Sequence, residues 1–135
     1  MTIDVLTADN VSVERLQGIF EAAYLDYEIL ANEELRVQEK IRIRVRFSQE
    51  RRAITLYAGY GFKAETTREQ RIEAANRINA EYLIVRCSVV EQSLWFEYDF
   101  MLDGGLAPKA LVLGLRRFAG IPPSAVDKHA AELIE

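Results

Sequence analysis

The side chains that most often carry out catalysis are scarce in this sequence. The chain has one cysteine, Cys87, and one histidine, His129. One cysteine excludes a disulfide framework and a cysteine-cluster zinc site, and one histidine excludes HExxH metal sites and most Ser-His-Asp arrangements. Cys87 alternates with apolar residues, which predicts a buried structural thiol, and His129 is expected to be solvated in a C-terminal helix. We therefore expect no catalytic residue, metal or cofactor.

Three arginines at alternate positions, Arg42, Arg44 and Arg46, predict a basic strand face that is suited to binding. In the register that matches the apolar faces of this strand and the next, Tyr57 lies opposite Arg44. Trp95 is expected on the same side of the sheet. Because Arg, Tyr and Trp are enriched at protein interfaces, we interpret this face as a protein-interaction surface. A merely solvated face is the main alternative, and binding of single-stranded nucleic acid is less favoured.

Two asparagines and two glycines are weaker candidates for a ligand site. Asn76 and Asn79 share one face of an expected helix, where their amides could hold backbone groups of adjacent strands or contact a ligand. Hydrogen bonding of the amides to adjacent backbone groups is favoured over ligand contact, since buried amides nearly always find hydrogen-bond partners within the fold. Gly104 and Gly105 precede another helix and could hold an anion or permit a tight strand-to-helix turn. The turn is favoured, because glycine adopts left-handed backbone conformations freely.

Alternation of apolar and polar residues predicts the strands that must position these side chains. The apolar runs lie at 27–30, 35–47, 54–58, 83–89 and 94–102. The run at 35–47 is interpreted as one strand, with Glu39 as its exception. For the last two runs, a turn at Gln92-Ser93 keeps both apolar faces together and pairs Arg86 with Asp99 on the outer face.

Apolar residues spaced three and four apart predict helices at about 12–25 and 66–81, and two shorter ones after Pro108. Gly120 and Ile121-Pro122-Pro123 are expected to separate these last two, because proline disrupts a helix interior. The order is helix, three strands, helix, two strands and two helices. Since hairpins join most strands, we expect an α+β domain with an antiparallel sheet of about five strands and helices mainly on one face.

The composition indicates one globular domain without a linker. The chain has 135 residues, half of them apolar, and a net charge of −4. Residues 1–35 hold eight acids and one base, whereas residues 36–52 hold seven bases and two acids. This asymmetry favours internal or inter-subunit complementarity over nucleic-acid binding. With no membrane-length apolar run, no signal peptide at the N-terminus and one thiol, we expect a cytoplasmic protein that does not bind membranes.

Short motifs in the second half of the chain resemble the YbjN family, a group of bacterial proteins described as sensory transduction regulators. They are Asn76-Arg77-Ile78-Asn79, the two-stranded hairpin after it, and Gly104-Gly105-Leu106 before an apolar helix ending at Phe118. The resemblance covers about residues 10–120 and leaves out a helical tail at about 121–135. It implies a single YbjN-like domain over 1–135, with the curved antiparallel sheet of type III secretion chaperones. Family members are often homodimers, and the family provides no catalytic residues to transfer.

These observations lead to one principal expectation about function and one alternative. We expect a non-enzymatic protein-binding module, regulatory or chaperone-like, that acts as a homodimer and binds a protein partner not identified by the sequence. The alternative is a small-ligand or nucleotide-binding regulatory domain, with Gly104-Gly105 or the Asn76 and Asn79 face as its site.

Overall fold

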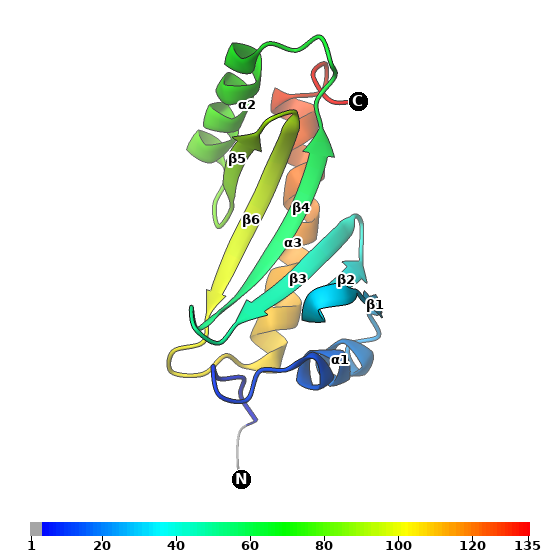
Figure 1. The fold of residues 1–135 in the computed structure, drawn as a ribbon, viewed down its shortest axis with the longest axis vertical. Helices are drawn as coiled ribbons and strands as arrows, with labels where there is room; N and C mark the ends of the chain where they lie inside the picture. The colour runs from blue at the N-terminus through cyan, green and yellow to red at the C-terminus, as the bar shows by residue number, and fades with distance from the viewer. Residues whose placement is uncertain (1–3) are drawn as a thin grey trace.

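Six strands form one antiparallel sheet in the spatial order β1-β2-β3-β4-β6-β5 (Figure 1). This computed structural model describes residues 4–135. The expectation that no signal peptide is present falls partly on residues 1–3, which lie outside the described residues. The strands are β1 (Asp26–Ile29), β2 (Leu35–Gln38), β3 (Arg42–Ser48), β4 (Ala53–Gly61), β5 (Arg86–Val90) and β6 (Ser93–Met101). The helices are α1 (Val13–Ala22), α2 (Arg68–Glu81), α3 (Pro108–His129) and a short 3-10 turn, η1 (Ala31–Glu33). The expected α+β class with an antiparallel sheet is confirmed.

The run at 35–47 forms two strands, so the prediction of one strand was wrong. β2 and β3 make a tight hairpin in which Leu35 lies opposite Val45 and Val37 lies opposite Ile43. Odd-numbered residues therefore face odd-numbered residues, and the apolar side chains of both strands stay on the core side. Because alternation continues through such a hairpin, it cannot distinguish the hairpin from one long strand.

The turn between β5 and β6 also differs from the prediction. It consists of Glu91 and Gln92, which places Arg86 opposite Glu97 rather than Asp99. The backbone of Glu91 has a φ of 55°, and this left-handed conformation suits a two-residue hairpin turn. The true register differs from the predicted one by two residues, so the apolar faces still match.

The helix α3 runs through Pro122 and Pro123, so the predicted break between two helices was wrong. Proline lacks an N–H and usually disrupts a helix interior. Here the buried stripe continues on both sides of the two prolines: Leu111, Val112, Leu115, Phe118, Ala119, Pro122 and Ala125. Burial along one continuous core keeps the helix in a single piece.

The core lies between α3 and one face of the sheet. Its largest fully buried strand residues include Leu35, Ile43, Ile54, Leu56, Leu94 and Phe96. Figure 1 shows α3 behind the sheet, α1 near β1 and α2 beside β5, with no helix of residues 4–135 across the front. We call this uncovered front the open face. It carries the outward-pointing residues of every strand.

The packing of α3 on β6 leads to a test with a matched control. A Cβ at Gly114 of α3 would come within 2.5 Å of the Phe100 ring. Alanine normally stabilises a helix relative to glycine by about 1 kcal/mol, but Gly114→Ala should destabilise the protein by about 1–3 kcal/mol through this clash. Gly18→Ala in α1, where no atom lies within 4 Å, should stabilise it. Urea unfolding measures both; a Gly114→Ala variant as stable as Gly18→Ala would contradict the packing.

Candidate protein-interaction site

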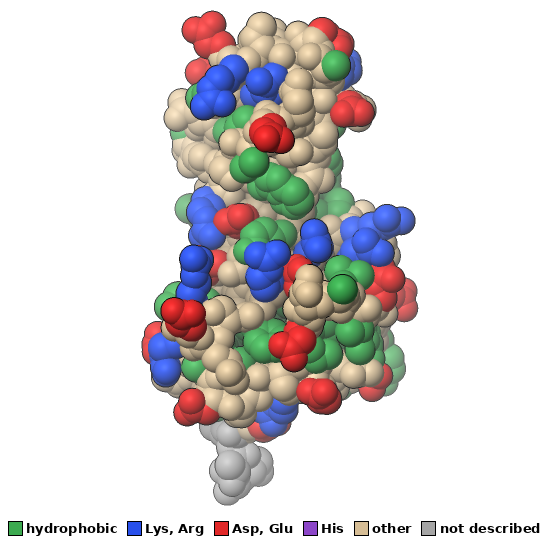
Figure 2. All heavy atoms as spheres, in the orientation of Figure 1, with side chains coloured by type: hydrophobic (Ala, Val, Ile, Leu, Met, Phe, Trp, Pro, Cys, Tyr) green, Lys and Arg blue, Asp and Glu red, His purple; other side chains and the backbone are tan. Residues whose placement is uncertain are grey.

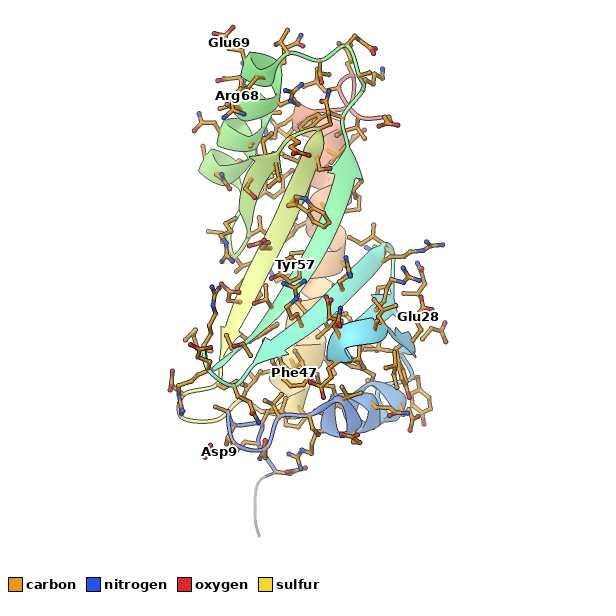
Figure 3. All side chains as sticks on the ribbon, viewed as in Figure 1. Asp9, Glu28, Phe47, Tyr57, Arg68 and Glu69 are labelled. Carbon is orange, nitrogen blue, oxygen red and sulfur yellow. The ribbon has the colours of Figure 1, made fainter. Side chains whose placement is uncertain are left out.

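Arginine and aromatic side chains lie together on the open face of the sheet. Arg44 lies opposite Tyr57, as the register of the apolar faces predicts. On the next strand, Glu97 lies opposite Tyr57, and Trp95 lies opposite Gly59. Figure 3 shows Tyr57 near the middle of this face. The five residues expected to form an interaction surface, Arg42, Arg44, Arg46, Tyr57 and Trp95, therefore belong to three neighbouring strands with their side chains on one side.

One buried carboxylate positions two of these arginines. Glu34, at the end of η1, is only 7% exposed. It accepts hydrogen bonds from Arg44 Nη2 at 3.5 Å and from Arg46 Nε at 3.3 Å. The Arg46 guanidinium also lies 4.9 Å from the centroid of the Tyr57 ring, within the range of a cation–π contact. Glu34 therefore links the start of β2 to the arginines of β3 and, through Arg46, to the aromatic ring of β4.

The sequence pattern did not single out Glu34. Its only signal was the acidic segment at 1–35 that precedes the basic segment at 36–52. The structure pairs acids of the first segment with bases of the second: Glu28 with Arg36, and Glu34 with Arg44 and Arg46. Part of the charge asymmetry is thus neutralised within the chain.

A second charged cluster lies at the other side of the open face. Arg86 of β5 contacts Glu97 at 2.6 Å and Asp99 at 2.5 Å. Asp99 also accepts a hydrogen bond from Thr55 Oγ1 at 2.5 Å. Burial tends to raise the pKa of Asp99, but the hydrogen bonds from Arg86 and Thr55 outweigh it and lower this pKa overall. The open face therefore carries fixed negative as well as positive charges.

Trp95 lies against a backbone position that only glycine can occupy. A Cβ at Gly59 would come within 2.6 Å of the Trp95 ring, so glycine lets the indole pack on the strand. Pairing of β3 with β4 ends at Arg44 and Tyr57, whereas β4 continues beside β6 to Gly61. Beyond this pair, β3 and β4 are no longer hydrogen-bonded to each other, which leaves an opening between them.

Two shallow hollows adjoin Trp95 on the open face. One, of about 330 Å³, lies over the opening between β3 and β4 and includes Arg42, Arg44 and Tyr57 in its lining. The other, of about 260 Å³, is lined by Arg44, Arg46, Tyr57, Val90, Trp95 and Glu97. Figure 2 shows basic, acidic and hydrophobic side chains gathered around the middle of this face. The hollows have the form of an uneven contact surface rather than of an enclosed chamber.

The two asparagines of α2 do not share a site in the structure. Asn79 makes two hydrogen bonds with the backbone of Cys87 in β5: Nδ2 donates to the carbonyl oxygen at 2.9 Å, and Oδ1 accepts from the N–H at 2.7 Å. Asn76 is exposed and lies outside the buried stripe of α2, which is formed by Ala74, Ala75 and Ile78. The amide of Asn79 thus fastens α2 to β5, and Asn76 takes no part in that contact.

The two glycines before α3 form a tight turn. Gly104 and Gly105 have φ values of 79° and 90°, in the left-handed region that favours glycine. A Cβ at Gly105 would come within 2.9 Å of Val5. The next residue, Leu106, pairs with Leu6 through two backbone hydrogen bonds of 2.8 Å. This turn brings the N-terminal segment onto the start of α3.

The single cysteine and histidine both have structural surroundings. Burial raises the pKa of Cys87 to about 12, so its side chain is a neutral thiol at physiological pH. The His129 side chain is 14% exposed, with Nε2 at 2.9 Å from Glu81, so the expectation of a solvated histidine was wrong. Hydrogen bonds from Lys128 and His129 lower the pKa of Glu81. Within residues 4–135, no group of three or more Cys, His, Asp or Glu residues could hold a metal.

Comparison with known proteins places this architecture in a family. The model of the YbjN family, described as “Putative bacterial sensory transduction regulator”, matches residues 12–121. The chain belongs to the YbjN family. The match to the YbjN model ends inside α3, and residues 122–135 continue that helix and the segment after it. No curated protein sequence matches the chain, and no helix of residues 4–135 is long and apolar enough to cross a membrane.

Two solved structures share the fold of this YbjN-family chain. The crystal structure of YbjN from E. coli, described as a putative transcription regulator, has a TM-score of 0.78 at 11% identity. That match covers 98% of this chain and 99% of the other. The Yersinia pestis type III secretion chaperone SycH, in complex with a stable fragment of YscM2, has a TM-score of 0.53 at 12% identity. It covers 88% of this chain and 97% of the other. The expected likeness to the chaperone fold is confirmed.

The Asn79 contact gives a test with its own control. Asn79→Ala removes both hydrogen bonds and leaves backbone groups of Cys87 unpaired, which should lower the free energy of unfolding by about 1–3 kcal/mol. Asn76→Ala should change it by less than about 0.5 kcal/mol, because the Asn76 side chain is exposed and makes no hydrogen bond within residues 4–135. Equilibrium urea unfolding compares the two variants. Equal losses would show that the amide of Asn79 does not anchor α2.

The Cys87 thiol predicts a pH dependence of stability. Its pKa is raised in the folded chain, so above an ordinary thiol pKa only the unfolded chain loses the proton, and stability falls as pH rises. Relative to Cys87→Ala, the wild type should lose about 1–2 kcal/mol between pH 8 and pH 10. Urea unfolding at each pH measures this difference. A constant difference between the two proteins would contradict a buried neutral thiol.

Proposed function

We propose that this YbjN-family chain is a regulatory, protein-binding module without catalytic activity, and that it acts in the cytoplasm as a homodimer. Its partner binds to the open face of the sheet. The observation that carries this proposal is the arrangement around Tyr57 and Trp95, where Glu34 holds Arg44 and Arg46 on a sheet face that none of the helices α1, α2 and α3 of residues 4–135 covers. The shared fold with SycH, a chaperone crystallised with a protein fragment, supports a protein as the ligand.

The open face is arranged to bind with a small loss of side-chain freedom. Ordering a long side chain at an interface costs about 0.5–1.5 kcal/mol, and this cost is lower where the side chain is already held. Glu34 and the Tyr57 ring hold Arg46, while Gly59 holds the Trp95 ring close to the backbone. Arg and Trp are residues in which binding energy is often concentrated. The face therefore offers preformed anchors.

The charges of this face favour a protein over nucleic acid. Glu97 and Asp99 lie beside the aromatic residues and stay close to Arg86. Fixed carboxylates would repel phosphate groups, whereas a protein segment can offer both signs of charge. Arg42 is exposed and has no ion-pair partner among residues 4–135, so it is available to a carboxylate of the partner.

The alternative of a small-ligand domain has weaker support. The amide of Asn79 is engaged by the backbone of Cys87, and Asn76 lies apart from it. Gly104 and Gly105 are explained by the backbone of the turn before α3. The roles of Asn79, Gly104 and Gly105 in the fold thus reduce the support for a ligand at either predicted site.

The proposal predicts that partner capture depends on the open face. Trp95→Ala and Arg42→Gln should each reduce capture of a partner protein from lysate by about tenfold or more. The first removes the indole held against Gly59, and the second removes an exposed guanidinium that makes no ion pair within residues 4–135. The matched control is Arg68→Gln on α2, which lies far from Tyr57 in Figure 3. Capture is quantified by mass spectrometry with the wild type as reference, and circular dichroism confirms that each variant is folded.

Two outcomes would contradict this proposal. Equal capture by Trp95→Ala, Arg42→Gln and the control would place the binding site elsewhere. A small molecule that co-purifies with the chain and raises its melting temperature, with no captured protein, would favour the ligand-binding alternative.

A further inference from the structure

A groove of about 630 Å³ lies between α1 and the first half of α3, outside the open face. Gly18, Ile19, Ala22 and Ala23 line it from α1, and Pro108, Lys109, Val112, Leu113 and Arg116 line it from α3. Asp4, Glu14 and Arg15 complete its rim. Leu113 is 54% exposed and, with Ile19 and Val112, makes the groove lining largely apolar. The groove is therefore an apolar surface between charged rims.

The α1 side of the groove carries small side chains. Gly18 and Ala22 are one helical turn apart, and both are exposed. A Cβ at Gly18 would meet no atom within 4 Å, so no contact within residues 4–135 requires a glycine there. Glycine in a helix interior costs about 1 kcal/mol relative to alanine. The space above Gly18 is open to a side chain from outside the chain.

The unpaired charges of the rim are complementary to each other. Arg15 pairs with Asp4 at 2.7 Å, and Arg116 pairs with Glu39 at 3.4 Å. The remaining two, Glu14 on α1 and Lys109 on α3, are exposed and have no ion-pair partner among residues 4–135. One wall thus presents a free acid and the opposite wall a free base.

We propose that a second copy of this chain covers the groove, related to the first by a two-fold axis. In such a contact the α1 of each copy lies against the α3 of the other. Glu14 of one copy then approaches Lys109 of the other, twice, and each Leu113 enters the space above Gly18 of its partner copy. This inference rests on the proposed homodimer and assigns its surface. It leaves the open face of the sheet free for the protein partner.

The first test fills the groove. Gly18→Leu places a side chain where the chain has open space and improves helix propensity, so the fold should be kept or stabilised. Sedimentation velocity and light scattering should show that the wild type is a dimer at tens of micromolar. In Gly18→Leu the dissociation constant should rise by about 100-fold or more. Two controls should remain dimeric: Gly18→Ala, which adds little bulk, and Asn76→Leu, which adds the same side chain on the exposed face of α2.

The second test exchanges the charges. Glu14→Lys and Lys109→Glu should each be monomeric alone, because each creates two like-charge contacts across the axis. An equimolar mixture of the two variants should form a heterodimer, since both contacts then join opposite charges. A merely structural effect of either substitution would not be rescued by mixing.

The outcomes separate this inference from the proposed function. A dimeric wild type with an equally dimeric Gly18→Leu, or charge variants that are not rescued by mixing, would overturn the groove as the dimer surface and leave the homodimer standing. A wild type that is monomeric at tens of micromolar would overturn the homodimer and the groove together. Loss of partner capture in Gly18→Leu would contradict the separation of the two surfaces.

Discussion

The helix α3 buries only one face of the sheet, and the alternation along each strand then decides which side chains enter the core and which reach solvent. Apolar residues such as Ile43 and Val45 point toward α3, so their neighbours Arg42, Arg44 and Arg46 must point away from it. This one-sided coverage produces the open face. Without it, the arginines would have no common surface.

Charge within the chain then determines how that surface is organised. The acidic N-terminal segment supplies Glu34, which sits almost buried between two arginines of β3. Arg86 is held in the same way by Glu97 and Asp99 on the far side. A buried carboxylate such as Glu34 is stable only when it is paired, so this carboxylate holds Arg44 and Arg46 in fixed positions. The same chain leaves Glu14 and Lys109 unpaired on its helical side, where we place the second copy.

Sequence reasoning succeeded where alternation alone decides the answer and failed where chain reversal or tertiary burial decides it. Matching the apolar faces was sufficient to place Arg44 opposite Tyr57. It could not reveal the hairpin inside 35–47, because odd-numbered residues are apolar and face the core on both sides of that hairpin. The local effect of Pro122 was overridden by burial along α3. Glu34 had no local signal, since its partners lie on another strand and are brought to it only by the sheet.

The most direct measurement of the central claim is site-specific photo-crosslinking in cells. A photo-reactive residue at Ser88, which is exposed on the open face opposite Trp95, is compared with one at Ile72, which is exposed on α2. The account predicts a covalent adduct with a partner protein from position 88 and none from position 72. Adducts from position 72 alone would contradict the open face as the binding surface.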